Sequence, residues 1–155
     1  MNVTAPMKTR LRADSGQSLV EFAITAIVFL LLVFSILDFS YLYFAKVTLQ
    51  SAVRQGGRYA ITGQAMTSKT RYDSILQTVK DSSLGFATNS NATISIYSAL
   101  GGSQTAGGPG DTITIAVTYN YYFITPMLAV LFTNGTYQFN VSASFKNEPF
   151  PPSQT

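Results

Sequence analysis

The chain has 155 residues, enough for one small domain and one additional element. Its composition is 46% hydrophobic and only 11% charged, against roughly 25% charged residues in an ordinary soluble domain, which indicates a membrane segment or a surface covered by partners. The net charge of +3 comes without a basic stripe interleaved with aromatics, so nucleic-acid binding is not expected, and the absence of Cys and His excludes disulfides, thiol catalysis, imidazole bases and the usual zinc sites.

The first predicted element is a long apolar helix. Uncharged residues fill the stretch Phe22–Leu37, between Glu21 and Asp38, and would form about 24 Å of helix. Continuation to Ala45 brings this to roughly 36 Å, enough to cross a hydrocarbon core of ~30 Å with some tilt. Leu, Ile, Val and Phe occur on all sides, which leaves no single apolar stripe for docking on a soluble core. We therefore expect residues 17–45 to form a transmembrane helix.

Two other interpretations of this helix are weaker. A buried helix of a globular protein would need a domain large enough to surround it, and the rest of the chain is too short. A cleaved secretory signal would explain the basic Lys8, Arg10 and Arg12, but the apolar run exceeds the usual length of about 7–15 residues and a carboxylate stands at its start. The same cations favour a cytoplasmic N-terminus. Lys46, Arg54 and Arg58 follow the other end of the helix, but a long downstream domain can be translocated regardless of its charge, so we expect the N-terminus inside.

That carboxylate, Glu21, needs compensation beside an apolar helix. Glu21 lies four residues, or one helical turn, beyond Gln17. Cleavage after Gly16 would therefore create an α-amino group within reach of Glu21, in the same subunit or in a neighbour. The positive N-terminus of the helix could also favour an acidic side chain here. Physical arguments alone favour neither of these two explanations for the position of Glu21.

The pattern Gly16, four residues, then Glu21-Phe22 and a long apolar helix resembles the processing site of type IV prepilins of the Tad subclass. The run LQSAVRQGGRYAITG, residues 49–63, is similar to the segment that follows the helix in the TadE family. The ending SASFKNEPF, residues 142–150, is similar to the C-termini of that family. Together these motifs resemble a TadE-like pseudopilin.

The resemblance implies a processed membrane protein. Residues 1–16 would be a leader that a prepilin peptidase removes between Gly16 and Gln17, with Phe22 recognised next to the cleavage site. Glu21 would pair with the new N-terminus when pilin helices assemble. The implied partners are the membrane, the peptidase, other pilin or pseudopilin subunits such as a TadF-like protein and the major pilin, and the Tad secretion apparatus.

Residues 46–61 are expected to continue the helix outside the membrane, because the pattern becomes amphipathic after Ala45. Gly56 and Gly57 could permit close packing or simply loosen the helix end. Arg54 and Arg58 are four residues apart and share one face. That face is either solvated or a contact for an acidic partner.

Residues 62–146 are expected to form a small exported α+β domain. Apolar residues at helical spacing predict a second, amphipathic helix over Thr67–Leu84, ended near Gly85. Alternating apolar residues predict three strands, and an antiparallel sheet packed on a helix would hide both apolar faces. The complete fold would be pilin-like. The three strands are expected at Ala92–Ala99, Thr112–Phe123 and Tyr137–Phe145, separated by a flexible loop at Gly101–Asp111 and a short helical turn after Pro126, with a flexible tail at residues 147–155.

The function predicted from these features is that of a minor pilin or pseudopilin in assembly of a Tad (type IVc) pilus. The protein would be a single-pass component of the bacterial inner membrane with its C-terminal domain exported. The alternative is an unprocessed single-pass anchor that presents a small binding domain. An enzyme is not expected, because the acidic residues are scattered without a nucleophile–base set, and no cofactor is expected. Sequence reasoning leaves Asp38 without a role.

Overall fold

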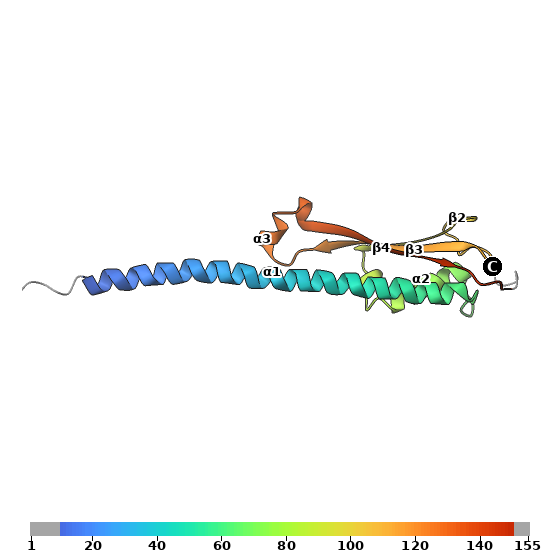
Figure 1. Ribbon diagram of the computed structural model, residues 1–155, viewed down its shortest axis with the longest axis horizontal. Helices are drawn as coiled ribbons and strands as arrows, with labels where there is room; N and C mark the ends of the chain where they lie inside the picture. The colour runs from blue at the N-terminus through green and yellow to red at the C-terminus, as the bar shows by residue number, and fades with distance from the viewer. Residues whose placement is uncertain (1–9, 151–155) are drawn as a thin grey trace, which may run out of the picture.

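The structure is a computed structural model that describes residues 10–150, with side chains described from Gly16 onward. Part of the expected leader, including Lys8, and the last five residues of the expected tail lie outside the described residues. The remaining chain forms one long helix with a sheet and a second helix beside its distal half (Figure 1).

Helix α1 runs without interruption over Arg10–Ile61, 52 residues, or about 78 Å. It begins earlier than the expected Gln17 and continues through Gly16, and it ends at Ile61 as predicted. Most apolar side chains of its first half, from Leu19 to Leu37, are exposed, and Leu31 and Val33 are partly exposed. In the part of the chain that the structure describes, α1 is the helix that is long and apolar enough to cross a membrane.

The sheet is antiparallel and has four strands in the order β2-β1-β3-β4, one more than the three predicted. The additional strand, β2, is a two-residue segment in the expected flexible loop and pairs with the end of β1. Two residues carry no detectable period, so this strand leaves no signal in the sequence. The strands are β1 (Ala92–Ser98), β2 (Gly102–Ser103), β3 (Thr112–Tyr122) and β4 (Thr136–Lys146).

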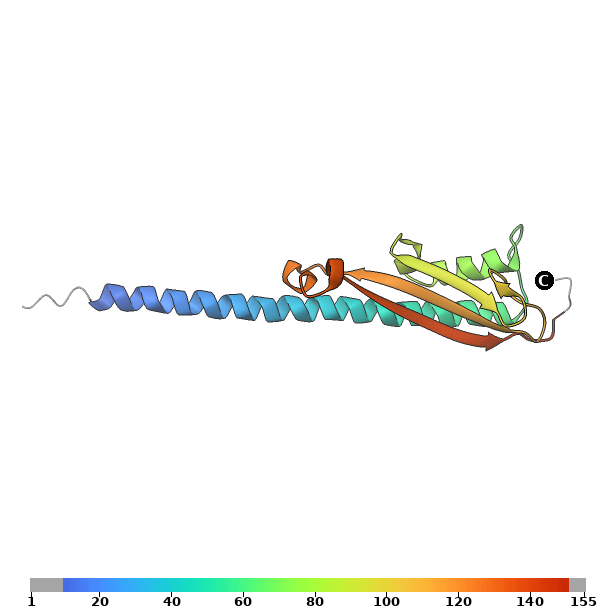
Figure 2. The same cartoon turned by 90° about the horizontal axis from the view of Figure 1, so that it is seen from above.

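One face of the sheet packs on α1, and the sheet lies along that helix in both views (Figures 1 and 2). The side chains on the other face are largely polar. The alternation predicted for β3 is confirmed, because every second side chain from Ile113 to Tyr121 is buried. These side chains share a core with Leu49 and Val53 of α1. On the opposite face, polar side chains pair across strands; the hydroxyls of Thr114 and Ser144, for example, are 2.8 Å apart.

The second helix, α2, spans Arg71–Asp81 and is shorter than the predicted Thr67–Leu84. Its start is fixed by Thr70, whose hydroxyl oxygen accepts a hydrogen bond from the Asp73 amide at 3.0 Å. Its end is followed by two residues with positive φ, Leu84 and Gly85. Ile75 and Val79 of α2 are fully buried in the core, as the helical spacing predicts.

The membrane-distal end of the domain is held by the buried Arg71. Its guanidinium donates hydrogen bonds to the carbonyl oxygens of Ala60 at 2.7 Å and Gly107 at 2.5 Å, and lies 4.4 Å from the centre of the Phe150 ring. The buried Asn147 also donates to the loop, 2.8 Å from the Gly108 oxygen. The expected flexible loop is therefore fixed at this point, and so are residues 147–150 of the expected flexible tail.

The adjacent glycines of α1 are buried where the helix meets the rest of the domain. A Cβ atom on Gly56 would collide with Val79 of α2, and one on Gly57 would collide with the ring of Phe145 on β4. Of the two alternatives for this pair, close packing is therefore what the structure contains, with side chains from both neighbouring elements resting on the helix backbone.

We expect Gly57→Ala to destabilise the domain by about 1–3 kcal/mol, because the Phe145 ring must move, even though Ala is favoured over Gly within a helix by about 1 kcal/mol. Chemical denaturation of the full chain in detergent measures the difference. Ser51→Ala, at an exposed position of the same helix, is the matched control and should leave stability nearly unchanged. Phe145→Leu added to Gly57→Ala should recover part of the loss. Wild-type stability of the Gly57→Ala protein would contradict this account.

Candidate functional site

The predicted processing segment lies on the uncovered half of α1. Gln17, Glu21 and Phe22 are all exposed, and a Cβ atom on Gly16 would have no neighbour within 4 Å. The Gln17 amide nitrogen donates to a Glu21 carboxylate oxygen at 3.4 Å. The structure thus places the side chains of Gln17 and Glu21 one above the other on a single face of the helix.

No side chain of the described helix between Phe22 and Leu37 is buried, although Leu31, Val33 and Ser35 are only partly exposed. Apolar side chains on every side of it are exposed, among them Phe22, Phe29 and Phe34. A contiguous apolar surface of this size is removed from water by lipid or by other helices. The first half of α1 is accordingly the part of the molecule built to lie in a membrane or a helix bundle.

Asp38 marks the point at which the domain begins to cover α1. Its side chain is only 1% exposed, unlike the apolar residues before it. One carboxylate oxygen accepts hydrogen bonds from the Tyr121 hydroxyl at 3.1 Å and the Ile124 amide at 3.0 Å. The other accepts from the Thr125 amide at 2.9 Å. Asp38 therefore holds the end of β3 and the turn that follows it against the helix.

The Asp38 hydrogen bonds position the connection between β3 and β4. This connection contains the short helix α3 (Pro126–Ala129) and a 3₁₀ turn at Thr133–Gly135. Phe123 stacks on Phe132 within it, with ring centres 4.4 Å apart. Burial, followed by the hydrogen bond and charge of the neighbouring carboxylate, raises the pKa of Tyr121 far above its ordinary value. Tyr121 therefore remains a neutral donor to Asp38.

Asp38 is the residue that sequence reasoning missed. Its partners lie more than 80 residues away along the chain, and no local period connects them. The available signal was the cost of a carboxylate at the end of an apolar run, which calls for compensation. The cost of an uncompensated carboxylate predicts a compensating partner for Asp38, as it does for Glu21.

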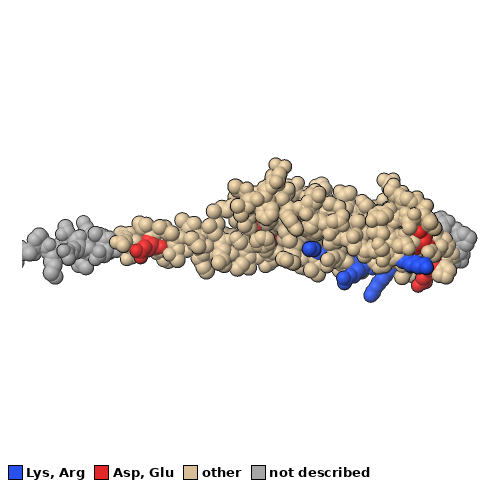
Figure 3. Space-filling view, turned by 45° about the horizontal axis from the view of Figure 1, so that its top comes forward, with Lys and Arg blue, Asp and Glu red and all other residues tan. Residues whose placement is uncertain are grey.

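Arg54 and Arg58 are exposed on α1 beyond the apolar half, apart from both Glu21 and Asp38. In the space-filling view, basic side chains gather over the distal half of the molecule, with acidic side chains at its far end, and another acidic group lies near the start of the described helix (Figure 3). The structure leaves both arginines accessible and brings neither to the processing segment.

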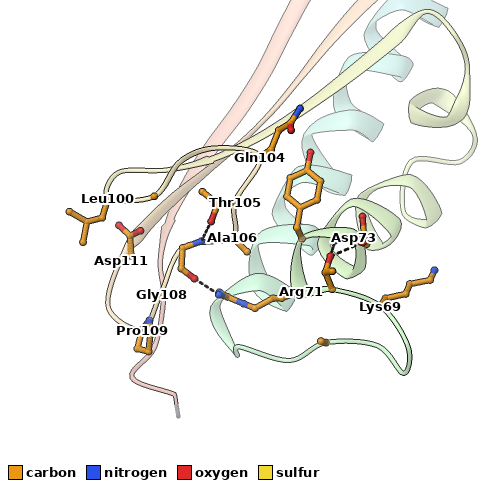
Figure 4. A pocket seen from close by; sticks show the side chains of 15 residues that line it. Lys69, Arg71, Asp73, Leu100, Gln104, Thr105, Ala106, Gly108, Pro109 and Asp111 are labelled. Carbon is orange, nitrogen blue, oxygen red and sulfur yellow. Dashed lines mark hydrogen bonds between the residues drawn. The ribbon is translucent and has the colours of Figure 1, made fainter. Parts of the chain in front are cut away.

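A hollow of about 900 Å³ lies at the distal end between the start of α2 and the loop before β3 (Figure 4). Lys69, Asp73 and Asp111 are among its charged lining residues. Asp111 uses one carboxylate oxygen to accept the Thr112 amide at 2.7 Å, which is a turn-forming contact. In the described residues no group of three or more His, Cys, Asp or Glu side chains could hold a metal ion.

The fold and the exposed apolar half of α1 define the class of the protein: it is an α+β protein with an N-terminal helix long and apolar enough to anchor it in a membrane. Comparison with protein families adds a match to the family described as TadE-like protein, over residues 16–58. From Gly16 to Arg58 the chain is TadE-like, and the resemblance seen in the sequence is confirmed for this segment. Comparison with curated proteins gave no match, and comparison with solved structures gave none.

We expect Asp38→Ala to release the turn after β3 from the helix. The substitution leaves the Ile124 and Thr125 amides without their acceptor, at about 1–3 kcal/mol for each buried donor that stays unsatisfied. The Tyr121 hydroxyl keeps the main-chain oxygen of residue 38, at 3.2 Å, as an acceptor. Hydrogen exchange of the full chain in detergent should show faster exchange at Ile124 and Thr125, with α2 unaffected. Tyr121→Phe, which removes one donor and leaves the carboxylate, should have a smaller effect. Unchanged exchange at both amides in Asp38→Ala would exclude this role.

Proposed function

We propose that the protein is a minor pilin or pseudopilin that takes part in assembly of a Tad (type IVc) pilus. The observation that carries the proposal is the TadE-like match over residues 16–58, on a helix whose apolar first half the domain leaves uncovered. The protein would reside in the bacterial inner membrane as a single-pass protein, with a cytoplasmic N-terminus and an exported domain.

In the proposed mechanism, residues 1–16 keep the precursor in the membrane until a prepilin peptidase cuts between Gly16 and Gln17, next to Phe22. The exposure of this segment supports access by a peptidase. Cleavage leaves an α-amino group at Gln17, on the face of the helix that carries Glu21. In a low dielectric an unpaired carboxylate is costly, so Glu21 would neutralise the amine of its own or a neighbouring subunit and set the register between helices.

The exposed apolar helix of residues 17–45 would pack with the helices of other pilins in this mechanism. The proposed partners are the major pilin, a TadF-like subunit and the Tad secretion apparatus. Arg54 and Arg58, exposed on the continuation of the helix at residues 46–61, would contact an acidic partner outside the membrane. The exported unit would comprise residues 62–146, together with the packed residues 147–150 that the structure adds to it.

An unprocessed single-pass anchor is the second candidate function. The observation in its favour is the continuity of α1 through Gly16, with no break at the proposed cleavage position. In that case the leader would stay attached and Glu21 would be dispensable.

We expect Gly16→Leu to block maturation. The side chain has room in the folded protein, because no atom lies within 4 Å of the Cβ position, so a loss of processing would reflect the peptidase and not misfolding. Mass spectrometry of the protein from its native membrane should find a wild-type N-terminus at Gln17 and an intact leader in the variant. A wild-type protein that keeps its leader would favour the unprocessed anchor.

We expect Glu21→Gln to insert normally and to reduce piliation. The amide preserves size and hydrogen bonding but removes the charge, so the variant tests charge pairing alone. Membrane fractionation and counting of surface pili by electron microscopy give the two readouts. Thr25→Ala, one turn further on the exposed part of the helix, is the matched control. Wild-type piliation of Glu21→Gln cells would exclude charge pairing while leaving the pilin assignment open to the processing test.

A further inference from the structure

The connection between β3 and β4, residues 123–135, is the most apolar exposed part of the domain; we call it the lip. Its side chains at Ile124, Met127, Val130 and Leu131 are exposed, with Val130 at 85%. The lip has no charged residue, and none occurs anywhere from residue 112 to residue 145. An apolar cluster of this kind on a protein surface marks a contact with another protein or with a membrane.

The lip has a fixed position along α1. It extends past Tyr122 and Thr136, the last pair of the β3–β4 ladder, toward the apolar half of the helix (Figures 1 and 2). The hydrogen bonds from the Ile124 and Thr125 amides to Asp38 hold it beside the residue that follows the apolar run. Contact between the Phe39 and Phe123 rings, 6.3 Å between centres, adds a second attachment. The apolar surface of the lip is thus continuous with that of the helix.

The length of the apolar run places Asp38 below the outer surface of the membrane. With Glu21 at the cytoplasmic boundary, a hydrocarbon core of ~30 Å takes about 20 residues of helix, which ends near Tyr41. Asp38 then lies about 4–5 Å inside that limit. A carboxylate at this depth requires hydrogen-bond donors and shielding, and the lip supplies both.

The groove between the helix and the lip matches the boundary of a bilayer in composition. It encloses about 250 Å³ and is lined by six apolar and aromatic side chains together with the half-buried Lys46. Aromatic side chains favour the interface between hydrocarbon and headgroups. Lys46 lies about 7 Å beyond Tyr41 along the helix, at the level of the headgroups, where a long cationic side chain reaches lipid phosphate.

We propose that the lip is inserted into the outer leaflet of the membrane, with Ile124, Met127, Val130 and Leu131 in contact with acyl chains and Lys46 directed to the headgroup phosphates. The inference rests on the membrane anchoring in the proposed function. It adds a second attachment, which fixes the depth and rotation of the domain. We favour lipid over a second protein as the partner of the lip because the lip is attached to the apolar span and is held at the same depth as the end of that span.

Single tryptophans can report the contact, since the sequence contains no Trp. The full chain carrying Val130→Trp is reconstituted in phosphatidylcholine–phosphatidylglycerol vesicles, with the phosphatidylcholine brominated near the headgroup or near the bilayer centre. Leu100→Trp is the matched control, because Leu100 is 88% exposed but lies in the turn between β1 and β2 at the distal end. Phe29→Trp reports the span itself.

We expect the emission of Val130→Trp to be quenched strongly by bromine near the headgroup and less by bromine near the bilayer centre. The emission of Phe29→Trp should be quenched by bromine near the centre. The emission of Leu100→Trp should be unaffected by bromine at either position. Quenching of Phe29→Trp without quenching of Val130→Trp overturns the lip proposal and leaves the anchor intact. Absence of quenching at both positions overturns the anchor as well. Emission of Val130→Trp that responds to the protein-to-lipid ratio but not to bromine would assign the lip to a neighbouring protein subunit and also overturn the proposal. Leu131→Trp repeats the test if Val130→Trp does not fold.

Discussion

The attachment of the sheet to the long helix depends on Asp38 at one end and on the glycine pair of α1 at the other. Near the apolar half, a single carboxylate accepts three hydrogen bonds from the end of β3 and the residues after it. Farther along, Gly56 and Gly57 let Val79 and Phe145 rest directly on the helix backbone. Between these points a continuous apolar core joins α1, α2 and the sheet. The domain thus lies lengthwise along the helix and cannot swing about one end of it.

The arrangement assigns different physical tasks to two carboxylates on one helix. Glu21 is exposed and has the Gln17 side chain beside it, so its compensation in the membrane would come from an amine created by processing or from a neighbour. Asp38 is fully compensated within its own chain. An exposed carboxylate can form contacts with another subunit, whereas a buried carboxylate already has its hydrogen-bond partners within the same chain. This contrast agrees with a role for Glu21 in assembly and a structural role for Asp38.

Local patterns in the sequence were sufficient for the main elements. The apolar run predicts the long helix, and the alternation in Thr112–Phe123 predicts β3 and its buried face, because both signals repeat over many residues. The two-residue β2, the role of Asp38 and the packing of residues 147–150 were not predictable in this way. Each depends on contacts between distant parts of the chain, such as that of Arg71 with Phe150, which leave no period in the sequence.

The continuity of α1 has a mechanical consequence. The helix contains no proline, and the backbone between its apolar half and its domain-bearing half has no hinge of the kind that proline provides. If the apolar half spans a bilayer, a tilt imposed on it by bilayer thickness or by neighbouring helices becomes an equal tilt of the whole domain. Because α1 is about 78 Å long, a small tilt of its N-terminal half produces a large lateral displacement of the domain at its C-terminal end.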